Sequence, residues 1–233
     1  MPRQTILIGT SGFSYDEWKG SFYPEKLKSK EYLAHYAGTF PTTEINNTFY
    51  RTPSARTVAG WAEQTPDDFR FALKLMQRVT HKKRLQDVDE EMEWFRRGVE
   101  PLEGRLAAVL VQLPPWFRYN PDVLESFLSE YAAKFPLAFE FRHRSWLDEN
   151  VAVLLERYGA TLVLAETDET PAPKLSVGPF RYVRLRKTDY EPAELESWSE
   201  WVKRQAVPSV VYFKHSTRAP VLAEAFQKMI GGT

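Results

Sequence analysis

Eight short apolar segments with the character of β-strands recur along the chain, and helical spacing of apolar residues separates most of them. Such alternation predicts a parallel sheet with right-handed crossovers, and eight units in 233 residues fit a compact α/β barrel of the (β/α)8 TIM type. Three prolines between residues 169 and 179 predict that the helix after the sixth strand is short or missing. The expected strands are residues 6–10, 42–46, 70–75, 106–113, 137–142, 161–165, 180–186 and 209–214.

The competing architecture is an open, doubly wound sheet. That fold often binds a dinucleotide through a Gly-x-Gly-x-x-Gly turn after its first strand. Only Gly9 and Gly12 lie near that position here, so dinucleotide binding is unsupported. No internal repeat, linker or low-complexity segment divides the chain, and we expect a single barrel domain over residues 1–233.

Charge and composition exclude several classes of function. The chain carries 31 basic and 31 acidic residues, so no global field draws it to nucleic acid or to an anionic membrane. It has no cysteine, which excludes disulfides, a thiol nucleophile and thiolate metal sites. The N-terminus lacks the apolar region of a signal peptide, and no segment approaches the ~20 apolar residues of a membrane span. We therefore expect a cytoplasmic protein without membrane contact.

Polar side chains gather where the expected strands end, which is where the active site of a (β/α)8 barrel lies. Apolar residues at alternate positions should face outward onto helices, and the polar residues between them should face the barrel interior. On the fifth strand, Phe139 and Phe141 should face outward and leave Glu140 and Arg142 inward. The same argument predicts inward positions for Glu44, Asn46, Lys74, Gln112, Tyr182, Arg184, Arg186, Tyr212 and Lys214.

The predicted mouth of the barrel is cationic although the whole chain is neutral. A cationic pocket with low-dielectric walls attracts and orients anions. The alternative is a set of ion pairs, such as Glu140 with Arg142 or Lys74, that only closes the end of the barrel. The five cations are Lys74, Arg142, Arg184, Arg186 and Lys214, and the two carboxylates are Glu44 and Glu140.

These residues predict an enzyme that acts on a phosphorylated or other anionic small molecule. Glu44 or Glu140 would serve as general acid or base, with Lys74 tuning the nearer carboxylate. Two carboxylates also permit glycoside cleavage, whose mechanism depends on their separation. The anion would be held by Arg142, Arg184, Arg186 and Lys214, and the substrate would be contacted by Asn46, Asn47, Tyr50 and Gln112.

Two other functions stay open. The first is nucleic-acid binding or phosphodiester processing by the basic pocket and the aromatic residues of the loops, although neutral net charge counts against it. The second is a non-catalytic ligand-binding or scaffold protein, which the fold does not exclude. The aromatic residues in question can stack on bases or sugars, or they can simply plug the rim: Phe13, Tyr15, Trp18, Phe49, Tyr50, Trp116 and Trp146.

Metal and nucleophile signals are weaker. The chain has no His-Glu-x-x-His, Gly-x-Ser-x-Gly or P-loop motif, so no metal site is predicted and the cofactor stays unassigned. Three histidines, His81, His143 and His215, follow expected strands, but ordinary loop histidines explain them better than a ligand set with Glu44 and Glu140. The basic cluster at residues 81–84 could contact phosphates, but a solvated loop is the default interpretation.

Several motifs together resemble the DUF72 family, also called YecE-like proteins. The most specific are residues 8–15 (Ile-Gly-Thr-Ser-Gly-Phe-Ser-Tyr), 44–50 (Glu-Ile-Asn-Asn-Thr-Phe-Tyr), 112–115 (Gln-Leu-Pro-Pro) and 140–143 (Glu-Phe-Arg-His). The resemblance spans nearly the whole chain and implies a TIM-type barrel, but it implies no reaction. The polar residues that recur in the family fall on Glu44, Asn46, Asn47, Lys74, Gln112, Glu140 and Arg142.

The C-terminal part departs from that family's pattern. Where the family typically ends its seventh strand in Arg-x-His-Gly, this chain has Arg186 and Lys187 at the last two positions. Where the family typically ends its eighth strand in two asparagines, this chain has Lys214 and His215. Cations thus replace amides and an imidazole, and this member is expected to prefer a different or more anionic ligand.

Overall fold

The strands of this computed structural model close into a barrel, and the model describes residues 5–214 and 216–231. All neighbouring strands are parallel and follow chain order, with β1 hydrogen-bonded to β8. This confirms the predicted (β/α)8 barrel and excludes the open sheet. The strands are β1 (Ile6–Ser11), β2 (Thr42–Ile45), β3 (Arg70–Lys74), β4 (Leu106–Gln112), β5 (Leu137–Glu140), β6 (Thr161–Glu166), β7 (Arg181–Leu185) and β8 (Ser209–Phe213).

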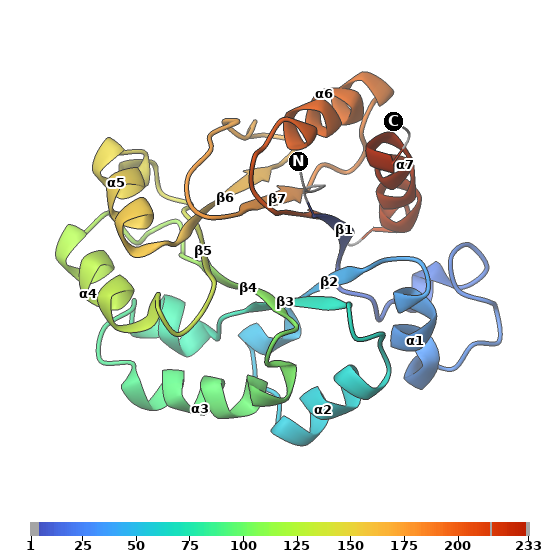
Figure 1. Cartoon of the computed structure of the whole chain (residues 1–233), viewed down its shortest axis with the longest axis horizontal. Coiled ribbons are helices and arrows are strands. Elements are labelled where there is room, and N and C mark those ends of the chain that lie inside the picture. Colours follow the sequence, from blue (N-terminus) through green and yellow to red (C-terminus); the bar gives the residue numbers. More distant parts are fainter. Residues whose placement is uncertain (1–4, 215, 232–233) are drawn as a thin grey trace.

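Helices surround the barrel in Figure 1, except between β6 and β7, where residues 167–180 contain no α-helix. The proline-rich segment had predicted this gap. Among the residues that the structure describes, no helix is both long and apolar enough to cross a membrane. The helices are α1 (Tyr32–Ala37), α2 (Ala55–Glu63), α3 (Asp89–Val99), α4 (Pro121–Tyr131), α5 (Glu149–Tyr158), α6 (Pro192–Lys203) and α7 (Ala219–Gly231).

Local signals in the sequence predict some helix ends correctly, such as the start of α4, but not others, such as the end of α3. Asn120 caps α4, since its side chain accepts a hydrogen bond from the Val123 N–H at 3.2 Å, and Pro121 occupies the first helical position. The apolar spacing over residues 88–102 predicts one helix, but α3 ends at Val99 and a 3-10 turn follows. Pro101 lies in that turn and has no N–H with which to continue the α-helical ladder.

Alternating side chains fill the barrel as predicted. Tyr182 and Tyr212 face inward from β7 and β8 with ring centroids 5.3 Å apart. Small side chains lie on the strands opposite, where Ala72, Ala108 and Ala138 leave room for these rings. The residues of opposite parity, such as Phe71 and Phe139, pack outward against the helices, as the sequence pattern predicts.

The long loop between β1 and α1 is part of the core rather than an open binding loop. Trp18 and Tyr23 are fully buried, and the Trp18 indole donates a hydrogen bond to the Ser216 carbonyl at 2.7 Å. Tyr23 stacks on Tyr32 with ring centroids 4.2 Å apart. The aromatic residues of this loop therefore plug the barrel wall between its first and last units.

Gly9 allows β1 and β2 to approach closely. A Cβ atom on Gly9 would lie 2.0 Å from the Thr42 carbonyl oxygen and 2.9 Å from the Tyr36 hydroxyl. That hydroxyl ties the two strands together, because it accepts from the Thr10 N–H at 2.8 Å and donates to the Thr42 carbonyl at 3.0 Å. A side chain here would push apart strands that carry site residues at their ends.

Gly9→Ala is expected to lower the free energy of unfolding by roughly 2–3 kcal/mol, the upper range for overpacking, because rigid backbone must move. Gly60→Ala is the matched control, since a Cβ on Gly60 in α2 meets nothing within 4 Å. That control should be neutral or stabilising by up to about 1 kcal/mol. Urea unfolding of both variants measures the difference, and equal effects would contradict the close approach of β1 and β2.

Candidate functional site

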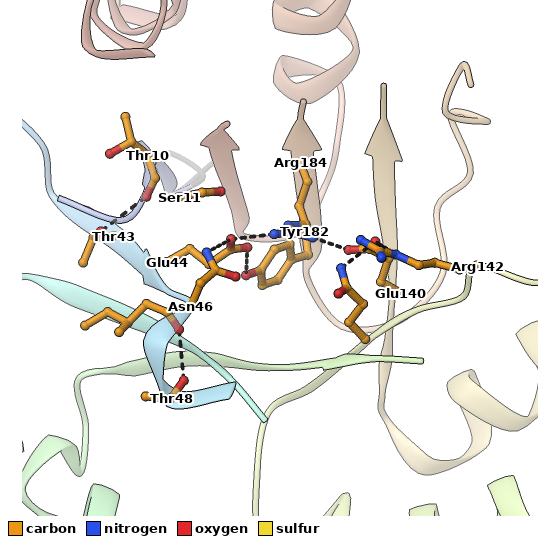
Figure 2. Close-up of polar contacts among 12 residues, drawn as sticks. Thr10, Ser11, Thr43, Glu44, Asn46, Thr48, Glu140, Arg142, Tyr182 and Arg184 are labelled. Atoms are coloured by element: carbon orange, nitrogen blue, oxygen red, sulfur yellow. Dashed lines mark hydrogen bonds and ion pairs between the residues drawn. The ribbon is translucent and has the colours of Figure 1, made fainter. Parts of the chain in front are cut away.

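Arg184 lies at the centre of the barrel mouth and joins two carboxylates from distant strands. Its side chain is 2% exposed, and its Nη2 lies 2.8 Å from Glu44 Oε1 on β2. Its Nη1 pairs with Glu140 Oε2 at the end of β5. Figure 2 shows the guanidinium between the two carboxylates, spanning the mouth from one side to the other.

Neighbouring side chains satisfy the remaining carboxylate oxygens. On Glu44, Oε1 also accepts from Asn46 Nδ2 at 2.9 Å, and Oε2 accepts from the Tyr182 hydroxyl at 2.7 Å. On Glu140, Oε1 accepts from Gln112 Nε2 at 2.8 Å. The same oxygen accepts from Arg142 Nε at 3.1 Å (Figure 2). Every carboxylate oxygen of the pair thus has at least one donor, as buried charges require.

This network keeps both carboxyls ionised. Burial alone would raise their pKa values, but the positive charge of Arg184 and the hydrogen bonds outweigh burial. The pKa of Glu140 is lowered to about 2, and the pKa of Glu44 is also lowered. The pKa of Arg184 is raised in turn by the two glutamates, despite its burial. At neutral pH neither glutamate carries a proton to donate.

Lys74 ends β3 and has a different environment. Its Nζ lies 4.1 Å from the centroid of the Phe49 ring, and in the described part of the chain no carboxylate oxygen lies within 4 Å of it. The Thr48 hydroxyl donates to the Lys74 carbonyl at 2.6 Å and holds the turn that carries Phe49 against it. Burial, followed by repulsion from Arg184, lowers the pKa of Lys74 to about 8.

Arg186 and Lys214 follow β7 and β8 at the same end of the barrel. The Arg186 N–H donates to the Glu166 carbonyl at 2.9 Å, and the Lys214 N–H donates to the Leu185 carbonyl at 2.8 Å. Burial lowers the pKa of the Arg186 guanidinium, and repulsion from Arg184 and Arg142 adds to this. Within residues 5–214 and 216–231, neither Arg186 nor Lys214 forms an ion pair.

Aromatic side chains form a wall beside Lys74. The Phe49 ring contacts His81 at a centroid distance of 4.9 Å, and His81 contacts Trp116 at 5.8 Å. Tyr50 extends this wall from Phe49 at 5.1 Å, and both Trp116 and Tyr50 are largely exposed. Burial lowers the pKa of His81, with smaller effects from Lys74 and Arg142, so its imidazole is neutral at neutral pH.

The structure brings together most of the residues predicted for the site. A hydrogen-bonded network joins six of them, and Lys74 and Arg186 lie close enough to interact electrostatically with Arg184. Asn47 and Tyr50 are exposed on the turn after β2, outside the network, and Lys214 has no side-chain contact with it in the described structure. The six joined residues are Glu44, Asn46, Gln112, Glu140, Arg142 and Arg184.

Two residues of the mouth were not assigned a role from the sequence. Tyr182 was predicted to face inward, but its hydrogen bond to Glu44 depends on barrel closure and has no local signal. Ser11 ends β1 opposite Glu44, and its hydroxyl is buried without a hydrogen-bond partner among the described residues (Figure 2).

The basic cluster at residues 81–84 serves the fold in part. Lys83 pairs with the buried Glu91 at 2.9 Å, and Arg78 pairs with the same carboxylate at 2.5 Å, which anchors the turn before α3. Among the described residues, which do not include His215, no group of three or more His, Asp or Glu side chains is placed to hold a metal ion.

Glu140→Gln is expected to lower the free energy of unfolding at pH 7 by about 3 kcal/mol, because it removes one counter-charge of a buried arginine. The folded-state pKa of about 2 lies below the ordinary value of 4.5, so this stabilisation is complete above pH 4.5. It is lost as pH falls toward 2, and the difference between wild type and variant should shrink in that window. Urea unfolding across pH 7 to pH 3 measures it.

Glu130→Gln is the control for this change. Glu130 lies in the last turn of α4 and forms an exposed ion pair with Lys134, which follows the helix. Its effect should stay within about 0.5 kcal/mol at all pH values. An effect of Glu140→Gln no larger than this control would show that Arg184 does not depend on Glu140.

Comparison with known proteins identifies the family. The family described as "Protein of unknown function DUF72" matches residues 7–233. The chain is 34% identical over 149 residues to the UPF0759 protein YunF of Bacillus subtilis, a match that covers 60% of this chain and 52% of YunF. It is 35% identical over 140 residues to the UPF0759 protein YecE of Escherichia coli K12, covering 59% of this chain and 48% of YecE. The matches thus span about half the length of these curated relatives.

Solved structures agree. A crystal structure of a DUF72 family protein from Thermotoga maritima superposes with a TM-score of 0.84 at 31% identity, over 97% of this chain and 99% of that one. A DUF72 family protein from Enterococcus faecalis gives a TM-score of 0.77 at 22% identity, over 98% of both chains, which supports the fold alone. From residue 7 to its C-terminus, this chain belongs to the DUF72 family.

Proposed function

We propose that this protein is an enzyme that acts on a small anionic molecule, such as a phosphorylated one, at the carboxyl ends of the barrel strands. The observation that carries this proposal is the positive charge left over after the ion pairs of the mouth have formed. Glu44 and Glu140 are both paired with Arg184, whereas Lys74 and Arg186 have no carboxylate partner in the described part of the chain.

These unpaired cations are held close to other cations at a cost in free energy. Burial lowers the pKa of both Lys74 and Arg186, and repulsion from Arg184 and Arg142 adds to this, while attraction to Glu140 and Glu44 offsets part of it. An anion bound between them would relieve this repulsion, and the low-dielectric walls of the mouth would strengthen its attraction. Arg142 can take part, because only its Nε contacts Glu140 and its side chain is 39% exposed.

Lys74 is the group best suited to move a proton. Its pKa of about 8 lies near neutral pH, so both its protonated and neutral forms are populated there. Glu44 and Glu140 fit a different role, in which they hold Arg184 in place and fix the geometry of the mouth. Asn46 and Gln112 donate to these carboxylates through their amides and keep the pair oriented.

Inorganic phosphate is expected to stabilise the wild-type protein, and Arg186→Gln should weaken this effect. At a phosphate concentration tenfold above the dissociation constant, binding contributes about 1.4 kcal/mol, which raises the melting temperature by roughly 3–5 °C in a chain of this size. Thermal unfolding at constant ionic strength, with chloride replacing phosphate in the reference, measures the shift.

Arg204→Gln is the matched control, because Arg204 is the exposed C-cap residue that follows α6, and among the described residues its one ion-pair partner is Glu200. It should keep the full phosphate shift, while Arg186→Gln should lose at least half of it without lowering the melting temperature of the phosphate-free protein. An equal phosphate shift in both variants would reject Arg186 as part of an anion site.

Turnover should depend on Lys74. In a screen of phosphate esters and other small anionic metabolites, Lys74→Met is expected to lower the rate with any substrate found by roughly two orders of magnitude or more, the usual contribution of a general acid or base. The rate of the variant is calculated per folded molecule, and thermal unfolding measures the folded fraction. A Lys74→Met variant with full activity would exclude proton transfer by this amine.

A further inference from the structure

We propose that the Lys74 amine forms an imine with an aldehyde or ketone that also carries an anionic group. The substrate class would then be oxo acids or phosphorylated carbonyl compounds. This inference rests on the proposed function, because the anionic group of such a substrate is what Arg186 and Arg142 would hold.

The position of Lys74 meets the geometric requirements for a lysine nucleophile. It ends β3, faces the interior of the barrel mouth, and is half-buried beside the Phe49 ring at 4.1 Å from Nζ. In the part of the chain that the structure describes, no carboxylate lies within ion-pair distance to hold the amine as an ammonium. A lysine becomes nucleophilic at neutral pH when it is desolvated or lies near other cations, and Lys74 meets both conditions.

The charge of the mouth supports the same chemistry. With a pKa of about 8, roughly one Lys74 amine in ten is neutral at pH 7, against fewer than one in a thousand for an ordinary lysine. The paired groups differ in this respect, because Arg184 stays protonated at all relevant pH values. Lys74 is thus the cation of the mouth that can lose its proton and attack a carbonyl carbon.

The reaction balances without an oxidant or a second reactant. The neutral amine attacks the carbonyl carbon, and the electron pair of the C=O bond moves to oxygen, which takes up a proton. Loss of this oxygen as water leaves a protonated imine, so an ammonium and a carbonyl compound give an iminium ion and water with the charge unchanged. The exposed side of the mouth, beside Arg142, gives that water a path to solvent.

The aromatic wall adds a site for the rest of the substrate. Phe49, His81 and Trp116 lie in edge-to-face contact beside Lys74, and Trp116 is 64% exposed. Exposed aromatic faces bind planar or sugar-like groups. A planar aldehyde with a phosphate group therefore matches the amine, the cations and the wall together.

Pyridoxal 5′-phosphate is such a compound and serves as the probe. The full-length protein is incubated with it at pH 8, the imine is reduced with borohydride, and peptide mass spectrometry locates the labelled lysines. Lys74 should be labelled about tenfold or more faster than the exposed Lys26 and Lys228, because far more of its amine is neutral at this pH. Inorganic phosphate should slow the labelling of Lys74 but not that of Lys26 or Lys228.

Two controls test separately whether labelling needs the nucleophilic amine of Lys74, rather than its positive charge alone, and whether it needs the phosphate group of the probe. Lys74→Arg should lose the label and keep the stabilisation by phosphate, because it retains the positive charge without a nucleophilic amine. Pyridoxal, which lacks the phosphate group, should label Lys74 at least severalfold more slowly than its phosphate ester does.

The outcomes distinguish this inference from the proposed function. If Lys74 is labelled no faster than Lys26 while phosphate still stabilises the protein, the imine proposal is overturned and the anion site stands. If pyridoxal and its phosphate ester label Lys74 equally fast, the pairing of carbonyl and anion in one substrate is overturned. If phosphate neither stabilises the protein nor slows the labelling, the proposed function falls as well.

Discussion

The structure of the barrel mouth depends on one buried guanidinium. Arg184 reaches from β7 to Glu44 on β2 and to Glu140 on β5, so strands far apart around the barrel are joined through a single side chain. A charge at this depth would be strongly destabilising without partners, and the partners are themselves buried. Arg184 therefore depends on both glutamates and each glutamate depends on Arg184, and this dependence sets the charge of the mouth.

One consequence is that neither of the two carboxylates carries a proton at neutral pH. Glu44 and Glu140 are held ionised by Arg184, and all their oxygens accept hydrogen bonds. Lys74 lies outside the network. Burial and the nearby guanidinium groups lower its pKa as well, but in an amine a lowered pKa favours the neutral form. The same arginine thus lowers the pKa of both glutamates and, together with burial, the pKa of the lysine. A second consequence is that Lys74 and Arg186 are left without an ion-pair partner among residues 5–214 and 216–231.

The sequence was sufficient to predict the barrel and the direction of its side chains. Phe139 and Phe141 alternate with Glu140 and Arg142 along the chain. Because successive side chains of a strand point to opposite sides of the sheet, this local pattern assigns each residue to the outside or the inside of the barrel. The absence of a helix between β6 and β7 also has a local signal, because the prolines in that segment disfavour an α-helix. These features need no knowledge of which strands are neighbours.

The partners within the mouth could not be predicted in the same way. From the sequence, an ion pair of Glu140 with Arg142 or Lys74 was the alternative to an open cationic pocket. The structure keeps the pair with Arg142, adds Arg184 as the shared partner, and leaves Lys74 against Phe49. These contacts depend on barrel closure and on side-chain length rather than on local pattern. For the same reason, the exposed positions of Asn47 and Tyr50 on the turn after β2 had no signal in the alternation.

The central claim is that Lys74 is a half-buried amine in a cationic mouth, without an ion-pair partner among the described residues, and its titration tests this most directly. Reductive methylation with 13C-labelled formaldehyde gives each lysine an NMR signal, and a Lys74→Arg variant assigns the signal of Lys74. The account predicts a pKa near 8 for Lys74 in the absence of ligand. It also predicts a rise toward the ordinary value when phosphate binds, because an anion favours the protonated amine. A pKa near 10.5 that does not respond to phosphate would contradict the account.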